Sequence, residues 1–245
     1  MLAAFAVMAG GICLAGCAST SPPVDASLVA SAPRNEPVRN EPVEQVVQPE
    51  TAIAGESASY AATKDAGFTV PAIKPGQVDP AFLRKSVAYS TKEPPGTIIV
   101  DTAKHYLYYV EAGGRATRYG IGVGRAGFAW SGEATIKSKQ EWPDWYPPKE
   151  MIERRPDLKK QLAELQSGPG VHGGPSNPLG ARAMYLWQGD RDTLFRIHGT
   201  NEPWTIGKSQ SSGCIRMINQ DAMDLYQKTA IGTRVVVLPT SVARR

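Results

Sequence analysis

From residue 97 onward, short runs of β-branched and aromatic residues alternate with turn residues. Residues 97–101 (TIIVD) and 105–110 (HYLYYV) are two such runs, close enough along the chain to form a hairpin. Further strands are predicted over 115–123, 134–140, 182–187, 193–198 and 233–238. Many short strands with one or two helices predict a mainly β domain, which we place at residues 91–240.

Two helices are expected between these strands. A Pro-Pro pair precedes the stretch 149–166, whose apolar residues recur on one helical face. A second helix is predicted over 220–229, with the side chain of Asn219 capping its first turn. Residues 78–90 are mixed in character and favour a short helix at the border of the domain.

A different composition precedes the β domain. Residues 17–90 are rich in Pro, Ala and Ser, and the pentapeptide Arg-Asn-Glu-Pro-Val occurs twice in tandem, over 34–38 and 39–43. Frequent prolines and scarce large apolar side chains cannot bury enough surface to offset the loss of chain entropy. We therefore predict that residues 17–90 form a disordered, extended tether between an anchor and the domain.

The N-terminus indicates export. Residues 1–16 are apolar and uncharged, too short to span a bilayer as a helix, and predict a signal peptide. They end in Leu-Ala-Gly before Cys17, which resembles a bacterial lipobox, so Cys17 is the expected lipidation site. Because Ala18 is not the aspartate associated with inner-membrane retention, the expected location is the periplasmic side of the outer membrane. The alternative is an ordinary secretory signal in which Cys17 has no special role.

The three cysteines, at positions 13, 17 and 214, do not suit a disulfide framework, which needs an even set. Cys13 lies in the predicted signal peptide and Cys17 is the expected lipidation site, which leaves Cys214 to be explained. His198 precedes Cys214 by sixteen residues, and a nearby imidazole can take the proton that a thiol must lose to attack. Gly213 allows a sharp turn, and backbone amides there can stabilise an oxyanion. A buried apolar cysteine and a structural histidine are the alternative interpretation.

The residues around this pair form distinctive strings. HGTNEP begins at His198, IG follows shortly after, and SSGCIRM surrounds Cys214. Together they resemble the L,D-transpeptidase family (YkuD domain). Residues 170–183 are similar to that family's Gly-Pro-x-Asn-Pro-Leu-Gly segment, and 142–151 to its Trp- and Pro-rich segment. Ser212 departs from the histidine that many members carry there, but the base is assigned to the earlier histidine.

The resemblance implies a role for each motif residue. Cys214 would be the nucleophile, and His198 the general base and later the acid. Gly199 would orient the imidazole through its carbonyl oxygen. Gly213 and Cys214 would supply oxyanion-hole amides, and Arg216 would brace the loop or act through its charge. Three more residues are expected to contact the substrate: Ser212, Trp204 and Asn177.

Over about residues 95–239, the resemblance implies a mixed, β-sandwich-like domain that transfers acyl groups on peptidoglycan stem peptides. Cys214 would form a thioester with the third residue of a tetrapeptide stem and release the terminal D-Ala. The acceptor would be an amine of another stem (a 3–3 cross-link), of an envelope lipoprotein, or of a D-amino acid. Water as acceptor would make an L,D-carboxypeptidase or an amidase, and a silent domain would make a non-catalytic wall-binding lipoprotein.

Metals, organic cofactors and nucleic acid are not expected. A thiolate, an imidazole and an oxyanion hole suffice for acyl transfer, and a net charge of +4 is too small to indicate a nucleic-acid partner. A zinc site built from His172, His198 and Cys214 is disfavoured by their wide spacing. His105 is predicted to be structural, within an apolar strand. Three aromatic residues either cover the cleft as a lid or pack against the domain: Trp142, Trp145 and Tyr146.

Overall fold

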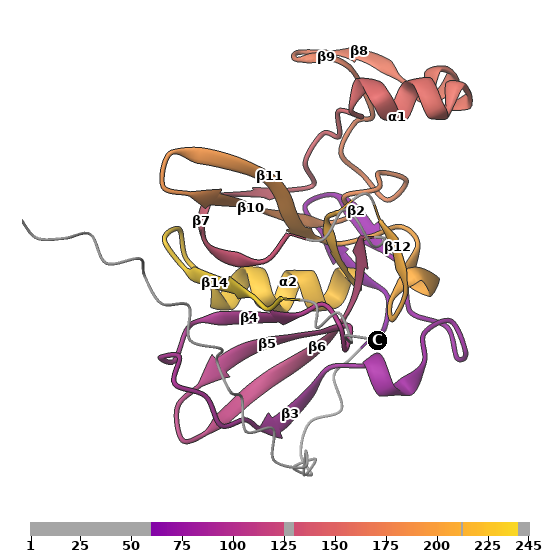
Figure 1. Ribbon diagram of the computed structural model, residues 1–245. Coiled ribbons are helices and arrows are strands. Elements are labelled where there is room, and N and C mark those ends of the chain that lie inside the picture. Colours follow the sequence, from indigo (N-terminus) through magenta and orange to yellow (C-terminus); the bar gives the residue numbers. More distant parts are fainter. Residues whose placement is uncertain (1–59, 125–129, 212, 240–245) are drawn as a thin grey trace, which may run out of the picture. The chain divides into compact units, whose positions relative to one another are not determined.

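The structure is a computed structural model that describes residues 60–124, 130–211 and 213–239 (Figure 1). The predicted signal peptide, Cys17, the tandem repeat and Ser212 lie outside the described residues. Within the described part, no helix has the length and apolar character needed to cross a membrane.

Strands dominate the described residues. They are β1 (Thr63–Asp65), β2 (Phe68–Val70), β3 (Lys85–Ala88), β4 (Ile98–Asp101), β5 (Tyr106–Glu111), β6 (Arg115–Gly124), β7 (Gly132–Glu141), β8 (Ala163–Leu165), β9 (Gly168–Gly170), β10 (Arg182–Gln188), β11 (Arg191–His198), β12 (Ser209–Ser211), β13 (Ile215–Met217) and β14 (Arg234–Val237). The helices are α1 (Lys149–Arg154) and α2 (Asn219–Lys228), with 3₁₀ turns at Pro80–Phe82, Pro156–Gln161 and Pro203–Thr205.

Most of these strands form one sheet that closes on itself. Its order is β12-β6-β13-β11-β10-β7-β14-β4-β5, and β5 pairs in turn with β6. In the closed part of the sheet, β11–β13 and β4–β14 are parallel and the other pairs are antiparallel. Figure 1 shows α2 between β4–β6 on one side and β10–β11 on the other. The prediction of a mainly β domain with mixed pairing is therefore confirmed.

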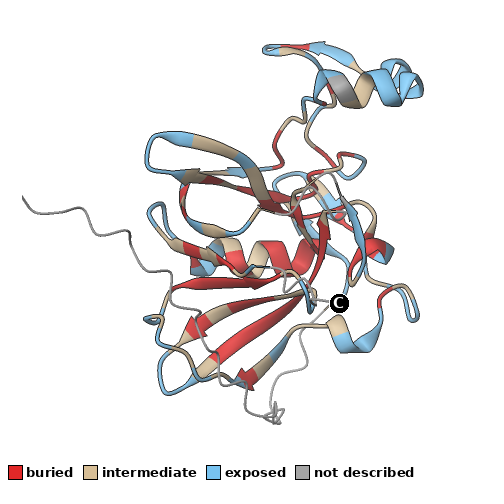
Figure 2. Cartoon of the chain, in the orientation of Figure 1, coloured by how far each residue is buried: buried red, intermediate tan, exposed pale blue. Residues whose placement is uncertain are grey.

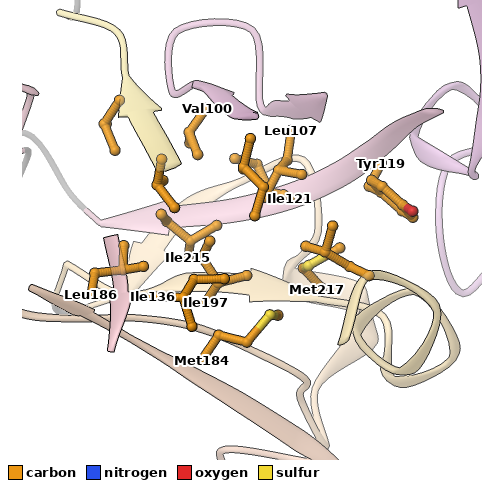
Figure 3. Packing of buried hydrophobic residues seen from close by; sticks show 14 of the residues in the cluster. Val100, Leu107, Tyr119, Ile121, Ile136, Met184, Leu186, Ile197, Ile215 and Met217 are labelled. Carbon is orange, nitrogen blue, oxygen red and sulfur yellow. The ribbon is translucent and has the colours of Figure 1, made fainter. Parts of the chain in front are cut away.

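The apolar faces of these strands meet in one core (Figure 3). The core side chains labelled in Figure 3 are at most 3% exposed: Val100, Leu107, Tyr119, Ile121, Ile136, Met184, Leu186, Ile197, Ile215 and Met217. Ala222 and Leu225 of α2 complete it. Burying each large aliphatic side chain contributes roughly 1.5–3 kcal/mol, so the strands that carry the core are the rigid part of the domain. In Figure 2 the buried residues follow the same strands.

The predicted hairpin of residues 97–110 is present, but His105 lies outside its strands. β4 and β5 pair antiparallel with Val100 opposite Leu107. His105 adopts a φ of 60° in the turn before β5, and its Nε2 lies 3.0 Å from the Ser209 hydroxyl. The placement of His105 within an apolar strand was therefore wrong, although its contact with β12 agrees with a structural role.

The helix predicted over 149–166 is also corrected. α1 ends at Arg154, a 3₁₀ turn follows, and residues 163–165 are already strand β8. Pro156 has no N–H for an α-helical hydrogen bond and disfavours helical backbone at the residue before it. Arg155 accordingly has φ −133° and ψ 72°. The apolar periodicity across this proline did not reveal the break.

The predicted tether extends too far toward the C-terminus. Residues 60–88, which we call the N-terminal arm, fold onto the domain: β1 and β2 form a hairpin, and β3 pairs with β6. Val70, Val78 and Val87 of the arm are 7% exposed or less. The apolar residues of the arm are too sparse to form a core of their own, and they are buried only because the domain supplies the other surface. The short helix expected over 78–90 is reduced to one 3₁₀ turn followed by β3.

Candidate active site

The parallel pair β11–β13 brings the predicted histidine and cysteine to one edge of the sheet. Ile197 lies opposite Ile215, and His198 opposite Arg216, so Cys214 enters β13 beside the end of β11. Ile197 and Ile215 are anchored in the core, which fixes the position of the residue next to each. His198 and Cys214 line the same cavity of about 260 Å³.

The opposite wall of this cavity comes from a flap, residues 145–171, which carries α1, β8 and β9 (Figure 1). Trp145 and Val171 close the base of the flap with two backbone hydrogen bonds of 2.9 and 2.8 Å. Met151, Arg155 and Leu158 of the flap line the cavity together with Trp145 and Val171. A ligand in this cavity would therefore contact mainly apolar groups on the flap side, together with the Arg155 guanidinium and the Gln161 amide.

The protonation of His198 follows from its contact with the next residue. Its Nδ1 lies 2.6 Å from the carbonyl oxygen of Gly199. A carbonyl oxygen only accepts hydrogen bonds, so Nδ1 carries the proton and Nε2 keeps its lone pair. This is the contact that the family resemblance implies for Gly199. It leaves Nε2 as the atom that can accept a proton from a nucleophile.

Burial keeps both reacting groups neutral. His198 is 3% exposed, and burial together with the positive charge of Arg216 lowers its pKa to about 4. Burial raises the pKa of the Cys214 thiol, and a backbone hydrogen bond with Arg196 and the charges of Arg196 and Arg216 only partly oppose that rise. At neutral pH the pair is therefore a thiol and a neutral imidazole, and the proton moves when the sulfur attacks.

Arg216 makes the contact expected of a bracing residue. Its Nη1 lies 3.0 Å from Oε2 of Glu202, which belongs to the loop after His198. The ion pair links β13 to that loop across the cavity edge, and both side chains line the cavity. Glu202 was quoted in the motif without a role, because a partner fourteen residues away cannot be assigned from the sequence.

Asn219 holds the histidine loop, a role that the sequence did not reveal. Its Oδ1 accepts hydrogen bonds from the N–H groups of Ala181 (3.0 Å) and Thr200 (3.1 Å), and its Nδ2 donates to the Thr200 carbonyl (2.9 Å). A methyl group on Gly180 or Gly199 would collide with this amide. Asn219 was predicted to cap the first turn of α2 with its side chain, and this is wrong. It is the first residue of α2, and its amide bonds to Ala181 and Thr200 instead.

We expect Asn219→Ala to destabilise the protein by about 2–4 kcal/mol, because two buried N–H groups and one carbonyl lose their partner. The Cys214 thiol should also react about tenfold more slowly with iodoacetamide, since the Gly199 carbonyl that orients His198 is no longer held. Urea unfolding and peptide mass mapping measure the two effects. Gln227→Ala, which removes an exposed amide from the same helix, should change neither; equal effects of the two substitutions would contradict the assignment.

The predicted substrate contact of Asn177 is wrong. Its side chain is fully buried, and Nδ2 lies 3.0 Å from each of three carbonyl oxygens, those of Pro143, Val171 and His172. Its Oδ1 accepts the N–H of Leu179. The amide is fully used in joining the two chain segments at the base of the flap, so it has no group left for a substrate.

The other predicted residues are placed as follows. Trp204 is 51% exposed and is not among the residues that line the cavity. Gly213 has a φ of 121°, a backbone conformation open to glycine, next to Cys214. The His172 side chain is 75% exposed, 3.8 Å from Asp144, and in the described part of the chain no three potential ligands are grouped to hold a metal. Of the three aromatic residues, only Trp145 lines the cavity.

Comparison with known proteins identifies the family to which this domain is similar. Residues 95–237, more than half of the chain, match the family model of the L,D-transpeptidase catalytic domain, YkuD. The chain is similar to the probable L,D-transpeptidase ErfK/SrfK of Escherichia coli K12, 34% identical over 152 residues that cover 59% of this chain and 44% of the relative. It is also similar to the probable L,D-transpeptidase YbiS of the same strain, 32% identical over 56% of this chain and 43% of the relative. The chain thus spans less than half the length of these two relatives.

A solved structure from Brucella melitensis, described as a probable carnitine operon oxidoreductase, is 53% identical. The match covers 66% of this chain and 96% of that chain, with a TM-score of 0.44. The oxidoreductase activity in that description refers to the Brucella protein and is not assigned to this chain.

Proposed function

Because the chain belongs to the L,D-transpeptidase catalytic domain (YkuD) family, we propose that it is a peptidoglycan L,D-transpeptidase that uses Cys214 as its nucleophile. The observation that carries the proposal is the hydrogen bond from His198 Nδ1 to the Gly199 carbonyl (2.6 Å), in the cavity that also exposes Cys214. That bond leaves Nε2 unprotonated in a cavity that also contains a thiol, and cysteine acyl transfer needs such a proton acceptor beside the nucleophile.

In the first step, Nε2 of His198 accepts the thiol proton as the sulfur of Cys214 attacks the carbonyl carbon of the third stem residue. The negative charge that develops on the carbonyl oxygen is stabilised by the backbone amides of Gly213 and Cys214. When the tetrahedral intermediate collapses, the bond to the terminal D-Ala breaks. The His198 imidazolium returns its proton to the departing amine, which leaves a thioester and neutral imidazole.

In the second step, an amine attacks the thioester carbonyl while His198 Nε2 takes its proton. The carbon–sulfur bond then breaks, and the proton returns to Cys214. The acceptor is a stem-peptide amine, which gives a 3–3 cross-link, a lysine of an envelope lipoprotein, or a D-amino acid. Water in the same position would give hydrolysis instead.

The test is incubation of the purified protein with a disaccharide-tetrapeptide that has diaminopimelate at the third position. We expect release of one D-Ala and a mass increase on the peptide containing Cys214, followed by transfer to an added amine. If the stem is shortened to the tripeptide and no product contains the added amine, the carboxypeptidase alternative is favoured. Absence of both D-Ala release and thioester would refute acyl transfer.

We expect this activity to persist well below pH 6.5. Nε2 must be neutral to accept a proton, and the His198 pKa of about 4 keeps it neutral, so the acidic limb of kcat/KM should lie near pH 4. Because the unfolded chain binds this proton more readily than the folded protein, the stability that His198 contributes above about pH 6.5 is lost as the pH falls toward 4. A pH–rate profile on protein shown by circular dichroism to be folded measures the limb; a limb at pH 6.5 would contradict the assignment.

We also propose that the protein is exported and held by lipid at Cys17, on the periplasmic side of the outer membrane. The support is the apolar run of residues 1–16 and the Leu-Ala-Gly sequence before Cys17. Mass spectrometry of the mature N-terminus tests this: we expect an acylated Cys17 as the first residue, and an unmodified Cys17 within the mature chain would refute the anchor.

A further inference from the structure

The N-terminal arm (residues 60–88) lies outside the span that matches the family model, residues 95–237, yet it contacts the elements that frame the active site. The Tyr60 hydroxyl lies 3.1 Å from Oδ1 of Asp221, in the first turn of α2. The preceding residue of that turn, Gln220, also contacts the arm, because its Nε2 donates a hydrogen bond to the Pro71 carbonyl at 2.9 Å. The arm is thus attached beside Asn219, which holds the histidine loop.

Asp65 is a further side chain of the arm that contacts the domain. Its carboxylate accepts two hydrogen bonds from the guanidinium of Arg182, at 2.7 and 2.8 Å, and a third from Trp142 Nε1 at 2.7 Å. The Arg182 side chain is only 6% exposed and that of Asp65 16%. A bidentate pair with so little solvent access is strongly oriented, and removing its charge leaves a buried guanidinium poorly compensated.

Arg182 connects Asp65 to the catalytic histidine through the backbone. Arg182 is the first residue of β10, and its carbonyl accepts the N–H of Gly199 at 2.9 Å. The carbonyl of the same Gly199 accepts the hydrogen bond from His198 Nδ1. Arg182 thus holds the His198–Gly199 peptide group, which directly precedes the peptide group whose carbonyl orients the imidazole, so a shift of Arg182 displaces the backbone at His198 and Gly199.

Trp142 connects Asp65 to the flap. It follows β7 with a φ of 43°, an uncommon conformation for a bulky residue, and its ring packs on Phe68 of the arm, with centroids 4.8 Å apart. In the segment that follows the flap, Gly173 lies so close to the Trp142 carbonyl that a side chain there would collide with it. The hydrogen bond to Asp65 therefore helps to hold the segment that leads from β7 into the flap.

We propose that Asp65 is a positioning residue of the active site, acting on His198 through Arg182 and on the flap through Trp142. The proposal rests on the proposed function for its kinetic readout. It makes the N-terminal arm part of the catalytic unit, although the arm contributes no residue to the cavity.

Two substitutions separate the two connections. Asp65→Asn keeps an oxygen for Trp142 but removes the charge that faces Arg182, so we expect the rate constant for acylation at saturating tetrapeptide to fall about tenfold. Trp142→Phe keeps the ring contact with Phe68 but removes the N–H, so we expect KM for the tetrapeptide to rise severalfold and the rate constant to stay within about twofold. Lys64→Ala is the matched control, because it removes only the exposed 2.7 Å contact with Thr69 in the same hairpin, and it should behave like the wild type.

Thermal unfolding and titration of the Cys214 thiol correct each rate for the fraction of folded protein. The proposal is overturned if Asp65→Asn has the wild-type rate constant, if its loss equals the loss of folded protein, or if Lys64→Ala is equally impaired. A wild-type protein that forms no acyl-enzyme would refute the proposed function instead. The rate of Cys214 alkylation by iodoacetamide then decides the positioning role: a slower reaction in Asp65→Asn than in Lys64→Ala supports it, and equal rates refute it.

Discussion

Replacing Cys214 by alanine is expected to abolish acyl-enzyme formation, with a loss of rate on the order of 10⁴-fold or more. Alanine leaves His198 without a group to activate, and no other thiol lines the cavity among the described residues. The wild-type protein incubated with a carbapenem should gain one covalent adduct on the peptide containing Cys214, and the alanine variant none. Intact-protein and peptide mass spectrometry measure both.

Cys214→Ser is the closest control for this substitution. It preserves size and hydrogen bonding, but a hydroxyl is far harder to deprotonate than a thiol, and an imidazole with a pKa of about 4 is a weak base. We therefore expect the serine variant to be folded and nearly as inactive as the alanine variant.

In cells, restoration of 3–3 dimers or of wall-bound lipoprotein by the alanine variant would contradict a catalytic role for Cys214.

His198→Gln is expected to lower acylation about 10³-fold at pH 7, since general-base assistance typically contributes 10²–10⁴-fold. Without the imidazole the sulfur must ionise by itself, and burial raises the pKa of the Cys214 thiol. The deficit should therefore shrink as the pH rises toward that pKa, where hydroxide removes the proton. Stopped-flow acylation by a carbapenem between pH 6 and 10 measures the trend.

His172→Gln is the matched control, because that imidazole is 75% exposed and does not line the cavity. It should leave the rate unchanged at every pH. A deficit of the His198 variant that is constant over the whole pH range would show that the ring is needed for structure and not for proton transfer.

These predictions depend on support that reaches the site from distant parts of the chain. Asn219 holds the peptide that orients His198, and Asn177 joins the two segments at the flap base. Asp65 contacts Arg182 and Trp142, the chain neighbours of residues that these two amides hold. None of the three lines the catalytic cavity. Their substitution is expected to alter geometry, so its effects should be smaller than those at Cys214 and His198.

The amino-acid sequence by itself determined the mainly β class, most of the strands and the pairing of His198 with Cys214. Strand patterning depends on neighbouring residues, and the motif residues are gathered within twenty positions, so both are visible locally. The sequence also indicated that Gly199 orients the imidazole, because the two residues are adjacent and the family resemblance assigns that contact.

Only the tertiary structure decided the ends of the flap helix, the folded N-terminal arm and the true roles of Asn177 and Asn219. An asparagine offers the same amide to a helix end, a substrate or a distant peptide group, and which of these it meets depends on segments brought together by folding. Asp65 and Arg182 are 117 positions apart, and the arm is stable only because the domain buries its few apolar residues. Such long-range partners leave no periodic signal in the sequence, and they are the contacts that hold this active site in place.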